Sequence, residues 1–300
     1  NYNVNGSIQR LNGYSTDVLT TQALTTLNAF ETDDDAPWFL YLAPQAPHSP
    51  FTPSSQYANA PVPAWTPGPA FNEADVSDKP PTVRWRTYSL SQAQSLRAAQ
   101  LRTLMSVDDM VQEVFDRMTA LGETNTLAIF MSDNGFLWGE HRIGSNKRFP
   151  YTEAFDVPMM MRWPGHVAAG VTDPRFVANV DITPTILDAT GTSPQVVYPL
   201  DGHSLLSSYA RSHMLLEYWR SPDADGIPGW ASIRTSTYQY TEWYADDRVT
   251  VTFREYYDLV NDPFQLVNLL ADGNPANDPN VAPLSAMLAA DRTCVGSNCP

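Results

Sequence analysis

The chain has 300 residues, of which 43% are hydrophobic, enough for one large domain or for one domain with a small satellite. Its 33 acidic residues outnumber 18 lysines and arginines, and the net charge of −15 argues against nucleic-acid binding, which needs a basic surface. An anionic small substrate is not excluded, because a metal ion or one cation can dominate a single pocket. No apolar run approaches the roughly 20 residues of a membrane-spanning helix, so no membrane span is expected.

The first forty residues predict a helix followed by a strand. The opening Asn1-Tyr2-Asn3 is neither an initiator methionine nor a signal peptide, so we expect the chain to begin inside a longer gene product. Apolar residues recur near a 3.6-residue period over 15–30, which predicts a helix. The nearly unbroken apolar run 38–43 predicts a buried strand of a parallel sheet.

A proline-rich loop follows that strand and contains His48. Prolines 44, 47, 50 and 53 stiffen the loop and limit the positions of the imidazole. Held at the carboxyl end of a strand, His48 can act near neutral pH as a proton donor or as a cation. A surface histidine in a proline-rich turn fits the same residues equally well.

The stretch 54–86 shows no periodicity and is predicted to be a long excursion, which in compact domains is usually a lid or a binding wall. Its aromatic and basic residues are candidates either for such a wall or for anchors that tie the loop to the surface. They are Trp65, Phe71, Trp85 and Arg86. A long helix with one apolar stripe is predicted over about 90–121.

The apolar strand predicted over 127–131 ends in Ser132-Asp133-Asn134-Gly135. Open α/β sheets present ligands at the carboxyl ends of their strands. The Asp133 carboxylate and the Asn134 side-chain carbonyl are hard oxygen donors suited to Ca²⁺ or Mg²⁺. Lys147 adds a compact positive charge thirteen residues beyond Asn134. Taken alone, the Asp-Asn-Gly triplet is better explained as a polar turn.

Beyond Lys147 the sequence first predicts short helices and strands, and then a sheet of different composition. A short helix is predicted over 148–156, a strand over 157–163, a strand over 176–181, and a helix over 183–188 that Thr183 caps. Past about residue 208, four short aromatic and β-branched runs predict a small antiparallel sheet, and a last helix is predicted over 282–290. We therefore place a domain boundary near residue 210.

Cys294 and Cys299 are the two cysteines of the chain, separated by Val-Gly-Ser-Asn. A tight local disulfide would fit this spacing and an exported protein, whereas two free thiols on the tail are the alternative. No histidine accompanies the pair, so a zinc site is not expected.

Several separate blocks together resemble the type I sulfatase family in order and spacing. They are APHSPF, SDNG, GEH, Lys147-Arg148, VPMMMRWPG, VDITPTILDATG and YYDLVNDPFQLVNL, and they span most of residues 36–270. Within the family, YNVNGSIQRLNGYSTDVLT, the APHSP loop and LMSVDDMVQ are most similar to the N-acetylglucosamine-6-sulfatase subgroup.

This resemblance implies an alkaline-phosphatase-like α/β fold with a mostly parallel central sheet and helices on both faces. A small C-terminal domain with an antiparallel sheet would follow. Residues 1–210 would then be the C-terminal portion of the catalytic domain. Residues 211–300 would be the small domain, ending in a helix and the Cys pair.

The resemblance also implies a site. Asp133 and Asn134 would supply two ligands to Ca²⁺, with Mg²⁺ as a possible substitute, and Lys147 would hold a sulfate oxygen. His48 would contact the sulfate and protonate the leaving alkoxide. His141, in GEH, would lie near the site among the substrate-binding residues. The substrate would be a sulfated sugar resembling N-acetylglucosamine-6-sulfate, or an aryl sulfate, and the protein would be exported to an extracellular, periplasmic or lysosomal location.

One family feature is missing. Sulfatases make their nucleophile, a formylglycine, from the Cys or Ser of a C/S-x-P-x-R motif, and no such motif occurs in these 300 residues. We therefore expect the nucleophile, and the remaining metal ligands, in an N-terminal part of the same protein, and we expect this chain alone to be inactive. A phosphoesterase or phosphonate hydrolase of the same superfamily and a non-catalytic binder of sulfated glycans are the alternatives.

Overall fold

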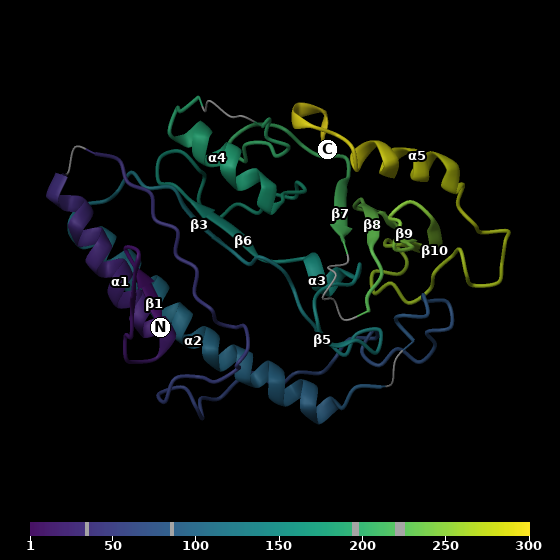
Figure 1. The fold of residues 1–300 in the computed structure, drawn as a ribbon, viewed down its shortest axis with the longest axis horizontal. Helices are drawn as coiled ribbons and strands as arrows, with labels where there is room; N and C mark the ends of the chain where they lie inside the picture. Colours follow the sequence, from purple (N-terminus) through teal and green to yellow (C-terminus); the bar gives the residue numbers. More distant parts are fainter. Residues whose placement is uncertain (34–35, 85–86, 194–197, 220–225) are drawn as a thin grey trace. The chain divides into compact units, whose positions relative to one another are not determined.

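The computed structural model describes residues 1–33, 36–84, 87–193, 198–219 and 226–300 (Figure 1). Two of the candidate wall residues, Trp85 and Arg86, lie outside the described residues. The chain forms two compact units. Unit 1 comprises residues 1–66, 90–126 and 162–167, and unit 2 comprises residues 67–89, 127–161 and 168–300. Residue 210 lies inside unit 2, so neither unit begins or ends there, and the domain boundary placed near residue 210 stays a prediction.

Unit 1 consists of a hairpin and two helices that pack on each other. The hairpin pairs β1 (Tyr2–Val4) with β2 (Ser7–Gln9). Helix α1 (Ser15–Phe30), followed by the 3-10 turn η1 (Glu31–Asp33), contacts α2 (Leu90–Leu121). The bounds of both long helices are those that their apolar periodicity predicts.

The predicted strand at 38–43 is wrong. The structure gives these residues no strand, and Phe39 and Tyr41 are 64% and 80% exposed. A strand exists only through hydrogen bonds to a neighbouring strand, and no described residue pairs with this run. The run is nevertheless attached to α1, because the ring of Trp38 stacks on Phe30 at 5.7 Å.

The excursion after residue 54 contains no helix or strand in its described part, as predicted. In unit 1 it is tied to α2, because Gln56 Nε2 and Tyr57 Oη donate to the Asp109 carboxylate at 2.9 and 2.7 Å. The Trp65 ring lies beside the Arg97 guanidinium, 5.8 Å away. Of the two roles considered for Trp65, the structure favours the anchor.

The first half of unit 2 contains four short strands, in two pairs, and three short helical elements. Strands β3 (Ala128–Met131) and β6 (Met159–Arg162) form a two-stranded sheet, and β4 (Leu137–Trp138) pairs antiparallel with β5 (Gly144–Asn146). The remaining elements are α3 (Thr152–Phe155), the 3-10 turn η2 (Asn179–Asp181) and α4 (Ile182–Ala189). The strand and the short helix predicted over 148–163 are thereby confirmed.

The predicted strand at 176–181 is wrong: the structure gives residues 176–178 no strand, and residues 179–181 form η2. The Asp181 carboxylate accepts a hydrogen bond from the Ala178 amide at 2.8 Å, which closes a turn instead of leaving extended backbone. Helix α4 begins at Ile182, so Thr183 lies inside the helix and is not its cap. An Asp side chain that bonds nearby backbone competes with extended structure in this way.

The second half of unit 2 is a four-stranded antiparallel sheet, as predicted. Its order is β10-β9-β8-β7. The strands are β7 (Met214–Tyr218), β8 (Trp230–Arg234), β9 (Tyr238–Tyr244) and β10 (Val251–Asp258). Helix α5 (Val281–Asp291) is at the predicted position (Figure 1). It contributes Leu288 to one buried cluster.

A second buried cluster joins this sheet to the loops around the candidate site. It contains sheet residues and residues from the stretch 137–154, and in this way the aromatic sheet supports the loop that carries Lys147. Its members include Leu137, Ile143, Phe149, Tyr151, Ala154, Trp230, Trp243 and Tyr257.

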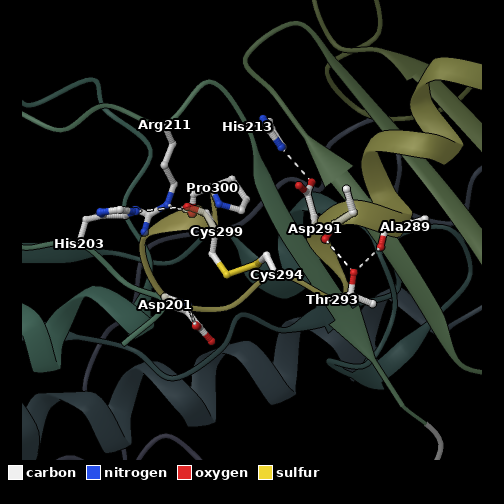
Figure 2. Close-up of a disulfide and its surroundings, with 12 residues drawn as sticks. Asp201, His203, Arg211, His213, Ala289, Asp291, Thr293, Cys294, Cys299 and Pro300 are labelled. Atoms are coloured by element: carbon white, nitrogen blue, oxygen red, sulfur yellow. Dashed lines mark hydrogen bonds and ion pairs between the residues drawn. A yellow bond between two sulfur atoms is a disulfide. The ribbon is translucent and has the colours of Figure 1, made fainter. Parts of the chain in front are cut away.

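Cys294 and Cys299 form a disulfide with a Cα–Cα distance of 5.1 Å, so the predicted local bridge is confirmed over the free thiols (Figure 2). The 3-10 turn η3 (Gly296–Asn298) lies inside the bridged loop. Among the described helices, none is both long and apolar enough to cross a membrane.

Candidate active site

The turn that follows β3 presents two oxygen donors. Ser132 Oγ donates to the Asn134 carbonyl at 2.9 Å, and the Asn134 amide donates to Asp133 Oδ1 at 3.0 Å. The exposed Asp133 carboxylate and the half-buried Asn134 amide therefore lie together at the carboxyl end of the strand. This is the position that the sequence predicts for both side chains.

Gly135 allows the turn to lie directly against α3. Its amide donates to the Ala154 carbonyl at 2.9 Å, and the Phe136 amide donates to the Glu153 carbonyl at 2.7 Å. A Cβ at position 135 would lie only 2.0 Å from the Glu153 carbonyl oxygen. No side chain fits there without displacing backbone, so the glycine is required for close approach.

Lys147 reaches back to this turn from the end of β5. Its Nζ donates to Asn134 Oδ1 at 2.8 Å. The side chain of Asn146 accepts from the Lys147 and Arg148 amides at 2.8 and 3.0 Å, which fixes the backbone where the lysine leaves the strand. The structure thus brings together three predicted site residues, Asp133, Asn134 and Lys147.

His141 lies in the protein interior. Its side chain is 0% exposed, and Nδ1 is 2.7 Å from Glu73 Oε2. Burial lowers the pKa of His141 to about 3, so the ring is neutral, and it stacks on Tyr151 at 4.0 Å. The predicted part of His141 in substrate binding stays a prediction, and this burial argues against it.

Glu73 and Lys79 extend this interior group of charges. Lys79 is 0% exposed, and its Nζ lies 3.1 Å from Glu73 Oε1 and 3.0 Å from Asp78 Oδ1. The same ammonium donates to the Leu266 carbonyl at 3.0 Å. Burial raises the pKa of Glu73 to about 7, against the opposing influence of Lys79. Sequence reasoning missed this group because the aperiodic excursion gives no burial signal for its charged residues.

The Glu73 segment also holds the loop that leads to Lys147. Arg142 Nε and Nη2 donate to the Glu73 and Ala74 carbonyls at 2.8 and 2.6 Å. The His141 amide donates to the Ala70 carbonyl at 2.8 Å. His141 and Arg142 both have positive φ, 50° and 62°, a conformation that costs energy unless its surroundings hold it. These hydrogen bonds supply that restraint.

His48 belongs to unit 1 and is exposed. Its Nδ1 is 3.1 Å from the Ser49 carbonyl oxygen, and Gln45 Nε2 donates to the same oxygen at 2.9 Å. The His48 amide donates to the Gln45 carbonyl at 2.8 Å, so the ring projects from a closed turn. These hydrogen bonds restrain the loop around His48 in addition to the stiffness that its prolines predict.

The donor chemistry of the turn fits part of a calcium site. Ca²⁺ takes about six to eight oxygen ligands, and Asp133 and Asn134 offer carboxylate and carbonyl oxygens. In the described part of the chain, no group of three or more His, Cys, Asp or Glu residues could hold a metal ion. Asp133 and Asn134 could therefore supply at most part of such a ligand set, and their role as metal ligands stays a prediction.

Solved structures identify the fold. The chain matches a structure described as bound to its substrate D-glucosamine-2-N,6-O-disulfate with a TM-score of 0.72 and 23% identity, covering 95% of this chain and 69% of the other. It matches a phosphonate monoester hydrolase from Silicibacter pomeroyi with a TM-score of 0.72 and 23% identity, covering 93% and 60%. The predicted alkaline-phosphatase-like α/β fold is thereby confirmed.

The family follows from the sequence comparisons. The Sulfatase family model matches residues 1–192, and the model for the C-terminal part of N-sulphoglucosamine sulphohydrolase matches residues 139–291. The chain belongs to the sulfatase family, as its motifs predict.

Curated relatives are consistent with the predicted subgroup. The chain is 29% identical to the N-acetylglucosamine-6-sulfatase of Bos taurus, over 95% of this chain and 56% of the relative. It is 28% identical to an arylsulfatase of Volvox carteri, over 95% and 52%. The chain thus spans about half the length of these relatives.

Proposed function

We propose that the full-length protein hydrolyses a sulfate ester, with a sugar resembling N-acetylglucosamine-6-sulfate or an aryl sulfate as substrate. The observation that carries the proposal is the contact between Lys147 Nζ and Asn134 Oδ1 at 2.8 Å, beside the exposed Asp133 carboxylate. This arrangement places one cation and two oxygen donors of the kind that bind Ca²⁺ at the end of one strand. Membership of the sulfatase family and similarity to sugar and aryl sulfatases support the reaction class.

The charges fit the chemistry of sulfuryl transfer. The equatorial oxygens of the transferring group carry negative charge, so catalysis requires cations directed at them. Lys147 would hold one such oxygen, and its contact with Asn134 would keep the ammonium beside the metal ligands. A calcium ion held in part by Asp133 and Asn134 would supply further positive charge.

His48 would serve the leaving group. A sugar alkoxide is a poor leaving group, and a proton delivered to its oxygen as the bond breaks accelerates the step by roughly 10²–10⁴-fold. The proline-rich turn with its internal hydrogen bonds limits the positions of this imidazole. The nucleophile is proposed to be a formylglycine in a segment outside these 300 residues, and the protein is proposed to be exported.

The proposal is tested with the full-length protein. We expect release of inorganic sulfate from an aryl sulfate and from N-acetylglucosamine-6-sulfate, and an aldehyde-bearing residue detected by mass spectrometry of the upstream segment. Full-length protein that carries no aldehyde and releases no sulfate from either compound would contradict the proposal.

Phosphonate monoester hydrolysis is the second candidate, because a hydrolase of that class matches this chain with a TM-score of 0.72. An aryl phosphonate monoester assayed beside the aryl sulfate separates the two. Faster turnover of the phosphonate ester would favour the second candidate.

A further inference from the structure

Asp133 is attached to a second segment through its backbone. Asn179, the first residue of η2, donates from Nδ2 to the Asp133 carbonyl at 3.1 Å. Both residues are exposed, and the Asn179 amide contributes little to the buried core. The bond instead links the backbone from which the Asp133 carboxylate projects to a turn 46 residues further along the chain.

The position of Asn179 is set by the buried carboxylate of Asp181. Asp181 is 0% exposed. Its Oδ2 accepts from the Ala178 amide at 2.8 Å, so the side chain folds back across Asn179 and fixes its backbone. Its Oδ1 accepts from the His203 amide, also at 2.8 Å. At position 202, a Cβ would lie 2.1 Å from the Val180 carbonyl oxygen, which shows how closely the two segments pack.

Arg211 completes the neutralisation of Asp181. Its Nη1 and Nη2 lie 2.6 and 2.5 Å from the two carboxylate oxygens, and its side chain is 3% exposed. A bidentate Arg–carboxylate pair is geometrically specific. Breaking a buried pair by removing one partner leaves an uncompensated charge, so the turn that carries Asn179 has one strongly favoured geometry.

Arg211 and His203 also contact the residues at the end of the disulfide segment. Arg211 Nε donates to the Pro300 carbonyl at 2.8 Å, and His203 Nε2 lies 3.3 Å from the Cys299 carbonyl (Figure 2). The Gly296 amide donates to the Asp201 carboxylate at 2.7 Å. A series of contacts therefore runs from Cys299 through His203, and from Pro300 through Arg211, to Asp181 and the turn that carries Asn179.

We propose that Asn179 is a positioning residue that orients the Asp133 carboxylate for metal binding, and that the Asp181–Arg211 pair holds Asn179 in place. This inference rests on the proposed role of Asp133 as a metal ligand. The direction of a carboxylate follows from its own backbone, and Asn179 restrains that backbone. Outer-shell partners of metal ligands affect metal affinity in this way, typically by 10–100-fold.

The first test uses calorimetry to measure calcium binding by the full-length protein. We expect Asn179→Ala to raise the Kd for Ca²⁺ by about tenfold. The Tm should stay close to that of the wild type, because the substitution removes an exposed amide. Asn179→Gln keeps the donor on a longer stem and should recover part of the affinity. Asn277→Ala is the matched control, since Asn277 Nδ2 makes a similar exposed bond to Asp272 at 2.7 Å, and should leave the Kd unchanged.

The second test does not depend on metal. Amide hydrogen exchange of the 131–136 segment should be faster in Asn179→Ala than in the wild type, with Asn277→Ala unchanged. Wild-type calcium affinity together with unchanged exchange in Asn179→Ala would overturn the inference and leave the proposed function intact. If the wild type itself binds no Ca²⁺, the proposed function and the metal part of the inference both fail. The exchange result then decides whether Asn179 orders the turn.

Discussion

Lys147 and Asn134 show how the site depends on single side chains. The lysine ammonium donates to the amide oxygen at 2.8 Å, and the same oxygen is a candidate metal ligand. An ammonium has three N–H donors, so Lys147 can keep its contact with Asn134 while it donates to a sulfate oxygen. The Asn146 side chain accepts a hydrogen bond from the Lys147 backbone amide, and this bond restrains the backbone from which the lysine side chain extends.

Replacing Lys147 by alanine should lower kcat/KM for sulfate release by the full-length enzyme by about 10²–10³-fold, the cost of losing one preorganised charge stabiliser. The measurement is steady-state hydrolysis of an aryl sulfate. Arg10→Ala removes an exposed cation of unit 1 and is the control for net charge. Undiminished turnover in Lys147→Ala would remove this residue from the mechanism.

Gly135 is expected to be intolerant of any side chain. Because a Cβ would lie 2.0 Å from the Glu153 carbonyl oxygen, Gly135→Ala must displace backbone. We expect a loss of about 1–3 kcal/mol in the free energy of unfolding, measured by urea denaturation. At Gly68 the nearest atom to a Cβ would be 3.4 Å away, so Gly68→Ala should cost much less. Equal costs at the two positions would refute the close-approach argument.

At the scale of elements, regular patterns in the sequence predict regular structure. Helices α1 and α2 have the predicted bounds, because long apolar stripes determine buried faces with little help from distant residues. The four strands of the antiparallel sheet were predictable from their aromatic and β-branched runs. The run 38–43 was not, because a strand also requires a partner strand, which the run itself does not specify.

The candidate site was predictable only in part. Asp133, Asn134 and Lys147 follow recognisable strand ends and motifs, and the structure brings them together. The burial of His141 against Glu73 depends on two segments 68 residues apart, and no local pattern reveals such a contact. Asn179 was missed for the same reason, since its partner is a main-chain oxygen 46 residues away.

Helix α3 contributes a pH-sensitive group, Glu153. Burial raises its pKa to about 7, and its Oε2 has no hydrogen-bond partner among the described residues. A carboxyl group with a raised pKa in the folded state holds its proton more tightly there than when unfolded. Its contribution to stability is complete below its unfolded pKa of 4.5 and is lost as pH rises through about 7.

The free energy of unfolding of Glu153→Gln should therefore depend less on pH than that of the wild type. Between pH 4.5 and 7.5, the free energy of unfolding of the wild type should fall relative to the variant by about 1–3 kcal/mol. Urea denaturation in metal-free buffer at several pH values measures this difference. Glu113→Gln, which removes an exposed carboxylate from α2, is the control. A constant difference between Glu153→Gln and wild type would contradict the assignment.

At the scale of the whole molecule, the chain corresponds to part of the length of the sulfatases it matches. It spans about half the length of the sulfatases it matches, covering 56% of one and 52% of another. Two oxygen ligands are fewer than Ca²⁺ requires, and the chain contains no C/S-x-P-x-R motif. Under the proposed function, the nucleophile and the remaining ligands would come from residues outside these 300.

Asp133 is proposed to be a metal ligand of a calcium-dependent sulfate ester hydrolase. The most direct measurement is sulfate release from N-acetylglucosamine-6-sulfate by the full-length protein, before and after chelation and after return of Ca²⁺. We expect chelation to abolish release, Ca²⁺ to restore it in the wild type, and Asp133→Ala to stay inactive at the same Ca²⁺ concentration. Release that survives chelation, or full activity in Asp133→Ala, would contradict this proposal.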